Sequence, residues 1–239
     1  MVIEPRELEE INQQFAEAEP QTILRWAWNR FGGSLGATSS FQSQSVPLLH
    51  MIATATPDMP VYFIDTGFHI KETLEFRDQL VEEFGLWVHN LQGDNRNKAY
   101  RQYFVYYRDL HSIDPDMCCA MHKVGPIKVA KSGFTAWISG IRRDQTENRR
   151  NTPVIGIDKT GQYKIAPLAN WTSQDVWRYM NQHDLPMHPL AKEGYMSIGC
   201  APCTAPIGAG DDERAGRWAG KNKVECGLHT TLWVIEYHL

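Results

Sequence analysis

The most constraining feature of this sequence is a repeated alternation of strand-like and helix-like segments between residues 34 and 140. Four apolar strand patterns occupy residues 34–40, 61–67, 86–92 and 134–140. Helical patterns lie between them, at residues 42–55, 71–85, 97–107 and 118–132. Because parallel strands need long and usually helical crossovers, this alternation predicts an α/β fold with a parallel sheet and helices on both faces.

Further helical patterns flank this region, and we expect helices at residues 5–18, 21–31 and 171–184. The last of these has Thr172 as its N-cap and Asp175 three residues later, which predicts a capping box. Short strands are expected at 154–158 and 163–169.

From residue 185 onward the chain is rich in Pro, Gly and Cys, so we expect loops there. Too few apolar residues remain in this part for a core of its own. We therefore expect one domain, with an α/β core over residues 21–184 and a Cys-containing segment over 185–239.

Composition argues against several functional classes. The chain has 239 residues and a formal charge of −4, which argues against a general nucleic-acid binder. It has no apolar run near the ~20 residues that span a bilayer and no signal-peptide pattern, so we expect a cytoplasmic protein without a membrane partner. An anionic ligand must then be held by a local basic cluster. The sequence leaves homo-oligomer formation open.

The five cysteines are arranged as Cys118-Cys119, Cys200-x-x-Cys203 and a lone Cys226. An odd number without a secretion signal fits poorly with a disulfide framework. Four thiolates suit a [4Fe–4S] cluster or a structural zinc. Helical neighbours point about 100° apart, an arrangement that a cluster accommodates better than one zinc ion. The alternative is a pair of buried structural cysteines plus a redox C-x-x-C.

Cys226 lies in KNKVECGLH, where charge and glycine suggest an exposed, mobile loop. A cysteine attacks as its thiolate, and nearby positive charge lowers its pKa. Basic residues that could do so are Arg214, Arg217, Lys221, Lys223 and His229. The alternative is a bystander thiol on the surface.

Two segments could bind an anion. The hydroxyl-rich segment, residues 38–45 (TSSFQSQS), joins a strand to a helix. It lacks the glycines and the lysine of a Walker A loop. The segment is either an anion-binding site or a simple N-cap of the helix. The arginine segment, residues 142–150, follows a strand that ends at Gly140. Such charge runs are often solvated, but ligands of open α/β sheets bind at the carboxyl ends of strands. Lys123 adds positive charge close to the tandem cysteines.

Eight ordered motifs carry a family resemblance over roughly residues 27–230: TSSFQSQS, FIDTGFHIKETLEFRDQL, CCAMHKVGPIKVA, SGIRRDQTENR, PLANWTSQDVWRYMNQHDLP, GYMSIGCAPCTAP, DDERAGRW and ECGLH. In these motifs the chain resembles the assimilatory adenylyl-sulfate and phosphoadenylyl-sulfate reductases. The resemblance implies an adenine-nucleotide α-hydrolase-like fold with a modified phosphate loop.

The resemblance also implies where the substrate binds. It assigns the phosphosulfate to Ser39, Ser40, Phe41 and Gln42, the nucleoside to Asp65, Thr66 and Gly67, and the adenine to the vicinity of Gly140. It assigns the anion to Lys123, Arg142, Arg143 and Arg149 or Arg150, and a closing C-terminal segment to Arg214, Arg217 and His229.

A [4Fe–4S] cluster held by Cys118, Cys119, Cys200 and Cys203 is implied in the same way, with Lys123 coupling it electrostatically to the substrate. Cys226 would attack the sulfate sulfur and form an S-sulfonate. Thioredoxin or a similar dithiol would then release sulfite. The cluster would serve positioning and electrostatics, since the dithiol supplies both electrons.

Four cluster cysteines favour adenylyl sulfate as substrate, with phosphoadenylyl sulfate, or both nucleotides, as the alternative. Two features depart from the family: His122 stands where arginine is common, which weakens the positive charge there, and an apolar tail follows ECGLHT. No thioredoxin-like domain is fused to the chain, so an external reductant is expected.

Two functions of other classes are the alternatives. One is a zinc-binding interaction module that uses the same four cysteines. The other is an ATP-dependent adenylating enzyme of the same fold, which needs a glycine-rich SGGxDS-type loop that TSSFQSQS does not supply.

Overall fold

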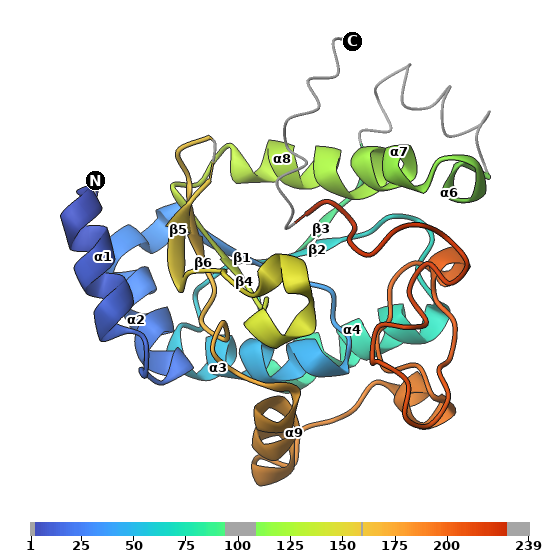
Figure 1. Cartoon of the computed structure of the whole chain (residues 1–239). Helices are drawn as coiled ribbons and strands as arrows, with labels where there is room; N and C mark the ends of the chain where they lie inside the picture. The colour runs from blue at the N-terminus through green and yellow to red at the C-terminus, as the bar shows by residue number, and fades with distance from the viewer. Residues whose placement is uncertain (1–2, 94–108, 159, 229–239) are drawn as a thin grey trace. The chain divides into compact units, whose positions relative to one another are not determined.

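The computed structural model describes residues 3–93, 109–158 and 160–228 (Figure 1). Six strands form one sheet in the order β3-β2-β1-β4-β6-β5. They are β1 (Leu35–Ser39), β2 (Val61–Ile64), β3 (Val88–Leu91), β4 (Ala136–Ser139), β5 (Ile155–Ile157) and β6 (Tyr163–Ile165). β1 is parallel to β2 and β4, and β4 is parallel to β6. The predicted α/β fold with a mainly parallel sheet is confirmed.

The described helices are α1 (Pro5–Gln14), α2 (Pro20–Phe31), α3 (Val46–Ala55), α4 (Lys71–Phe84), α6 (Leu110–Ile113), α7 (Pro115–Cys119), α8 (Gly125–Lys131) and α9 (Ser173–Gln182). α1 ends earlier than predicted, since the main chain leaves the helical region at its C-cap Phe15, at φ −90° and ψ 3°, and α2 begins anew at Pro20. The residue before a proline avoids the helical region, and Glu19 is extended at ψ 138°. The helix predicted at 97–107 lies outside the described residues.

β5 departs from the parallel arrangement, because it pairs with β6 in the antiparallel direction. The connection is a short turn in which Gly161 has φ +81° and the Asp158 N–H donates to the Gln162 carbonyl at 2.9 Å. So short a connection cannot make a parallel crossover, and the two strands form a hairpin.

Helix α1 covers the edge strand β5. The Asn12 side chain donates to the Ile155 carbonyl at 2.8 Å and accepts from the Ile155 N–H at 3.0 Å. An unpaired strand edge is a template for association with another chain. The Asn12 amide therefore takes the place of a further strand at this position.

The central strands are buried, as expected of a sheet with helices packed on it. Leu35, Ala37, Val61, Phe63 and Ile138 have no exposed surface. The β1–β4 register places Thr38 opposite Ser139, so the segments that follow these two strands leave the sheet at the same edge. This pairing brings the hydroxyl-rich segment and the arginine segment together.

Internal contacts divide the chain into two compact units. The sheet unit consists of Met1–Phe63, Asp78–His89 and Lys131–Met187, and the cysteine unit of Ile64–Arg77, Asn90–Ala130 and His188–Leu239, as far as these ranges are described. In the cysteine unit the predicted loop-rich C-terminal part contains only short turns of 3-10 helix, η6 (Pro189–Glu193) and η7 (Ala201–Cys203), among its described residues. Within the described ranges, no helix is both long enough and apolar enough to cross a membrane.

Candidate functional site

The hydroxyl-rich segment begins at the carboxyl end of β1 and runs into the first turn of α3. Phe41 has φ +51°, a left-handed conformation that favours glycine, and its side chain is fully buried. Its ring packs edge-to-face against Phe63 at 5.6 Å between centroids, and its N–H donates to the Ser39 hydroxyl at 3.1 Å. Burial of the ring therefore holds the main chain of this segment in an unfavourable shape.

Two other predicted substrate residues in this segment have local partners. The Ser40 hydroxyl lies 3.1 Å from the Ser45 hydroxyl, and the Gln42 carbonyl accepts from the Ser45 N–H at 2.8 Å. A tight, hydroxyl-lined turn of this kind can present N–H and O–H donors to an anion. Gly140, on the neighbouring strand end, lies against α3, since a Cβ there would be 3.2 Å from Leu48.

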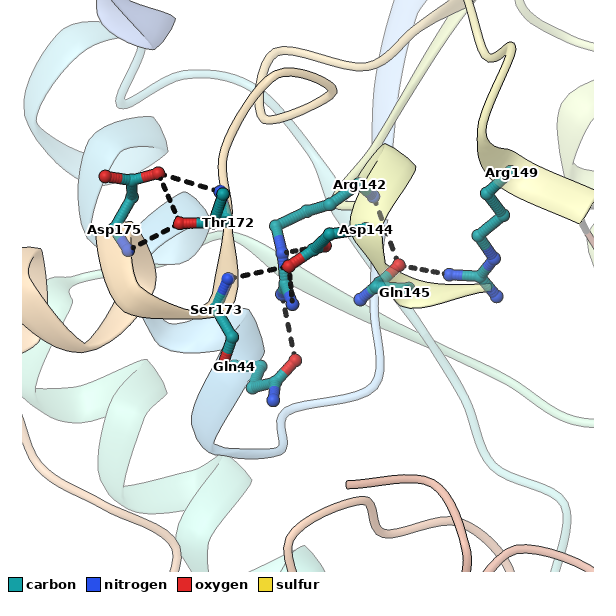
Figure 2. Close-up of polar contacts among 8 residues, drawn as sticks. All are labelled: Gln44, Arg142, Asp144, Gln145, Arg149, Thr172, Ser173 and Asp175. Atoms are coloured by element: carbon teal, nitrogen blue, oxygen red, sulfur yellow. Dashed lines mark hydrogen bonds and ion pairs between the residues drawn. The ribbon is translucent and has the colours of Figure 1, made fainter. Parts of the chain in front are cut away.

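The arginine segment contains two buried arginines. Arg142 is 1% exposed; its guanidinium donates to Asp144 at 2.9 Å and to Gln44 at 2.8 Å (Figure 2). Arg149 is also buried, and it donates to the Gln145 side chain. The sequence did not predict that Arg142 would be fully buried.

The other two arginines of the segment are exposed and face different partners. Arg143 donates to the Thr152 carbonyl at 2.8 Å and to the Asn170 side chain. Arg150 forms an ion pair with Glu147 at 2.8 Å. The four arginines predicted to hold the anion thus differ in exposure and partners, and their contact with substrate stays a prediction.

In the cysteine unit, four cysteines from distant parts of the chain line one pocket. Cys118 and Cys119 end α7, while Cys200 precedes the short turn η7 and Cys203 ends it, and each is at most 9% exposed. The pocket is also lined by Lys123, His122, Phe68 and Trp218. No group of three or more His, Cys, Asp or Glu side chains in the described ranges is arranged to hold a single metal ion.

A π-helix separates the tandem cysteines from α8, where the sequence predicted one continuous helix over 118–132. This π-helix, η3 (Ala120–Val124), ends where the Gly125 N–H donates to the Ala120 carbonyl, five residues earlier. The next residue, Pro126, has no N–H and cannot continue the usual ladder. The wider turn carries His122 and Lys123, which line the pocket.

Burial and mutual repulsion oppose ionisation of these thiols. Burial first, and then the neighbouring cysteines, raise the pKa of Cys118 to about 12. Burial raises the pKa of Cys119 to about 11, even though Lys123 lowers it. Burial alone would lower the pKa of Lys123, but the thiolates of Cys200 and Cys226 outweigh it, so that the pKa of Lys123 is raised. Such a set of thiols needs bound positive charge to become fully ionised.

His122, the departure from the family pattern, is 4% exposed. Burial and the nearby Lys123 lower its pKa, which keeps the imidazole neutral near pH 7. A neutral imidazole at this position adds no positive charge beside the pocket, and the comparison with an arginine stays a prediction.

Cys226 is half-buried rather than on an exposed loop, which corrects the sequence-based expectation. It packs against the group formed by Cys119, Cys200, Cys203 and Trp218. The following residue, Gly227, has φ +88°, and a Cβ there would lie 3.5 Å from Val124 of η3. Glycine thus permits the tight turn that keeps Cys226 beside the pocket.

Lysine side chains hold this C-terminal segment against helices α6 and α7. Lys221 donates to the His111 carbonyl at 2.5 Å, and Lys223 pairs with Asp116. Residues 111 and 116 lie more than a hundred positions away in the sequence, so no local pattern revealed these contacts. They explain why the segment is not an isolated loop.

Arg214 and Arg217 are also engaged within this segment. Arg214 donates to the Val224 carbonyl at 2.9 Å and lies 3.8 Å from Glu225. Arg217 donates to the Ile198 carbonyl at 3.1 Å, and its guanidinium lies 4.5 Å from the centre of the Trp218 ring. His229, predicted to act in the same segment, lies outside the described residues.

The Asp65-Thr66-Gly67 turn follows β2 and reaches the cysteine pocket. The Asp65 carboxylate accepts from the Gly67 N–H at 3.0 Å and from the Gln92 side chain at 2.8 Å. Burial alone would raise the pKa of Asp65, but these two hydrogen bonds lower it. The Thr66 hydroxyl lies 3.3 Å from the Cys200 sulfur, a contact that the sequence did not predict.

Comparison with known proteins agrees with this fold and residue set. Residues 35–206 match the phosphoadenosine phosphosulfate reductase domain. The chain is 42% identical over 222 residues to the adenosine 5'-phosphosulfate reductase of Streptomyces coelicolor, with 92% of each chain covered. It is 40% identical over 232 residues to the phosphoadenosine 5'-phosphosulfate reductase of Gloeobacter violaceus, with 96% of each covered.

A solved structure points the same way. The phosphoadenylyl-sulfate reductase of Candida auris, crystallised as a phosphate complex, resembles this chain with a TM-score of 0.74 at 25% identity. The likeness covers 86% of this chain and 99% of the other. Fold and pocket define an α/β protein with a cysteine-lined site. Within that class, the chain belongs to the phosphoadenosine phosphosulfate reductase family.

Proposed function

We propose that this protein reduces adenylyl sulfate to sulfite and AMP in assimilatory sulfate reduction, with Cys226 as the nucleophile. The observation that carries this proposal is the packing of Cys226 against Cys119, Cys200 and Cys203, next to Lys123. A thiol beside a cationic side chain is the arrangement that nucleophilic cysteines use. The adenosine 5'-phosphosulfate reductase from Streptomyces, 42% identical over most of the chain, supports the choice of substrate.

The reaction divides into a transfer of the sulfonate group to Cys226 and two subsequent thiol exchange steps. The Cys226 thiolate attacks the sulfate sulfur, a new S–S bond forms, and the bond to the bridging oxygen breaks so that AMP leaves with the electron pair. A dithiol protein such as thioredoxin then attacks the Cys226 sulfur and expels sulfite. Its second thiol resolves the mixed disulfide, and the dithiol has supplied both electrons.

Positive side chains would favour the first step by stabilising charge on the leaving phosphate. Lys123 carries a proton in this setting, because the nearby thiolates raise its pKa. Preorganised charge of this kind is often the largest contribution to rate. The hydroxyl-rich segment and the arginine segment, both at the carboxyl edge of the sheet, are proposed to bind the phosphosulfate.

The donor set of the pocket fits a [4Fe–4S] cluster. Four buried thiols are soft ligands typical of iron–sulfur groups, and Cys118, Cys119, Cys200 and Cys203 would hold it. When bound, the group would supply positive charge and rigidity to the cysteine unit. Reduced thioredoxin and iron–sulfur proteins both favour a reducing compartment, and we propose the cytoplasm.

Phosphoadenylyl sulfate is the second candidate substrate. It is favoured by the 40% identity to a phosphoadenosine 5'-phosphosulfate reductase from Gloeobacter. The two nucleotides differ by one 3'-phosphate, so the chemistry at Cys226 would be the same.

Sulfite release measured with each nucleotide and reduced thioredoxin tests the proposal. We expect kcat/KM at least about tenfold higher for adenylyl sulfate, a difference that corresponds to about 1.4 kcal/mol of transition-state binding. A reversed ratio would assign the protein to phosphoadenylyl sulfate. If an anaerobically purified protein with its metal intact releases no sulfite from either nucleotide, the proposal is wrong.

A further inference from the structure

We propose that Arg142 is a positioning residue that fixes the hydroxyl-rich segment through Gln44 and does not itself bind the anion. The inference rests on the proposed function, because it concerns how the phosphosulfate site is kept in shape. It also revises the role that the sequence suggested for Arg142.

The guanidinium of Arg142 is buried and paired with a carboxylate. Arg142 is 1% exposed, and its Nε and Nη2 donate to the two carboxylate oxygens of Asp144 at 2.9 and 3.4 Å (Figure 2). A buried cation is tolerated when a carboxylate pairs with it and its N–H groups are satisfied. Asp144 meets this requirement, so Arg142 has no need of a bound anion.

Arg142 also contacts the hydroxyl-rich segment. Nη1 of Arg142 donates to the Gln44 side-chain oxygen at 2.8 Å. Gln44 lies in the single turn η2 (Ser43–Ser45), which begins two residues after the strained Phe41 and runs directly into α3. A charge-assisted hydrogen bond to Gln44 holds the end of the hydroxyl-rich segment, which also contains the predicted phosphosulfate donors.

Further hydrogen bonds hold Asp144 and Arg149 in place. The Asp144 carboxylate also accepts from the Ser173 N–H at 2.7 Å, at the capped start of α9. The Gln145 side-chain oxygen accepts from the Arg142 main-chain N–H at 3.1 Å and from the Arg149 guanidinium (Figure 2). The network therefore ties the hydroxyl-rich segment to α9 and to a second buried arginine.

A substrate anion that took Arg142 as its ligand would have to displace the Asp144 carboxylate from a guanidinium that is 1% exposed. Positioning makes no such demand, since the network is complete without ligand. Small displacements of a binding segment cost affinity even when no contact residue is changed. Arg142 then contributes to phosphosulfate binding only through the geometry of the turn at Gln44.

A double-mutant cycle on the anaerobically purified full chain tests this inference. The variants are Arg142→Met, Gln44→Met and the double variant, each of which removes the hydrogen bond and leaves an unbranched apolar side chain. Arg178→Met is the matched control, because this exposed arginine of α9 pairs only at the surface with Asp175. Titration calorimetry gives Kd for AMP and for adenosine, which lacks the phosphate, and sulfite release gives kcat/KM.

Positioning predicts that each single variant weakens AMP binding by about tenfold. The double variant should be no worse than about threefold beyond either, since both single variants remove the Arg142–Gln44 hydrogen bond and Arg142→Met additionally removes only the pairing with Asp144. Adenosine binding should change less than about twofold, and Arg178→Met should match the native protein. kcat/KM should fall in parallel with AMP affinity.

Effects of Arg142→Met and Gln44→Met that multiply would show direct anion binding by Arg142 and overturn the inference, while leaving the proposed function intact. Native protein that binds neither AMP nor adenylyl sulfate would overturn both. If Arg142→Met does not fold, Gln44→Met alone decides: AMP affinity equal to that of the native protein would refute the role of the turn.

Discussion

The hydroxyl oxygen of Thr66 lies 3.3 Å from the sulfur of Cys200, and it also accepts from the Phe68 N–H at 3.2 Å. Thr66 belongs to the turn that follows β2, and Cys200 begins the C-x-x-C motif. One hydroxyl thus connects the predicted nucleoside turn to the cysteine pocket within the same compact unit.

Thr66→Val tests this connection, because it keeps the shape of the side chain and removes the hydroxyl. The Phe68 N–H loses its acceptor, and a lost hydrogen bond of this kind costs about 1–2 kcal/mol of unfolding free energy. Urea unfolding under anaerobic conditions measures the change. Thr66→Ser retains the hydroxyl but deletes a buried methyl group, which costs about 0.8 kcal/mol; a Val variant as stable as the native protein would contradict the role of this hydroxyl.

Gly216→Ala should destabilise the C-terminal segment. A Cβ at Gly216 would lie 2.0 Å from the Ala205 carbonyl oxygen, so the main chain must move apart. We expect a loss of about 2–3 kcal/mol, typical of overpacking at a rigid site. Gly33→Ala is the control, since a Cβ there meets nothing within 4 Å. Thermal unfolding compares the two, and a Gly216 variant as stable as the Gly33 variant would disprove the close approach.

His188 should make the protein less stable as the pH falls below neutral. It is fully buried; its ring accepts from the Leu190 N–H at 3.3 Å and contacts the Thr73 hydroxyl at 3.0 Å. Burial lowers the pKa of His188 from 6.5 to about 4. Between these pH values the unfolded chain binds a proton that the folded chain excludes, so stability is complete above pH 6.5 and declines toward pH 4.

The decline attributable to His188 is about 3 kcal/mol, from a shift of more than two pKa units. Chemical unfolding at a series of pH values, compared with His188→Asn, isolates it from the other histidines. The variant lacks the titrating ring, so its stability should fall less steeply from pH 6.5 to 4. Parallel curves would contradict the buried, neutral state of His188.

The metal content should depend on the pocket cysteines and not on Cys226. Protein purified without oxygen should be brown and carry about four irons and four sulfides per chain. Cys203→Ser should lose most of this content, whereas Cys226→Ser should retain it. Metal and sulfide analysis decides the question: a colourless protein with one zinc per chain would support the zinc-binding module instead.

Local patterns predicted the elements of the fold well. The strands around β1, β2 and β4 are short segments between helical patterns, and the Thr172–Asp175 capping box depends on residues three positions apart. The antiparallel β5 could also have been predicted, because its connection to β6 is too short for a crossover.

Contacts between distant residues account for what the sequence did not predict. The sequence did not reveal that Arg142 is buried, because its partner Gln44 is 98 positions away. Cys226 looked exposed because the lysines that anchor its segment bind residues more than a hundred positions earlier. The family resemblance predicted that the four pocket cysteines act together; their spacing alone left other arrangements open.

The central claim is that Cys226 becomes sulfonated by the substrate. The most direct test is the intact mass of the anaerobically purified protein after mixing with adenylyl sulfate or phosphoadenylyl sulfate in the absence of reductant. We predict an added mass corresponding to one SO₃ group, formed faster with adenylyl sulfate, absent in Cys226→Ser and removed by reduced thioredoxin. An unchanged mass with both nucleotides, from protein that retains its metal, would contradict the covalent mechanism.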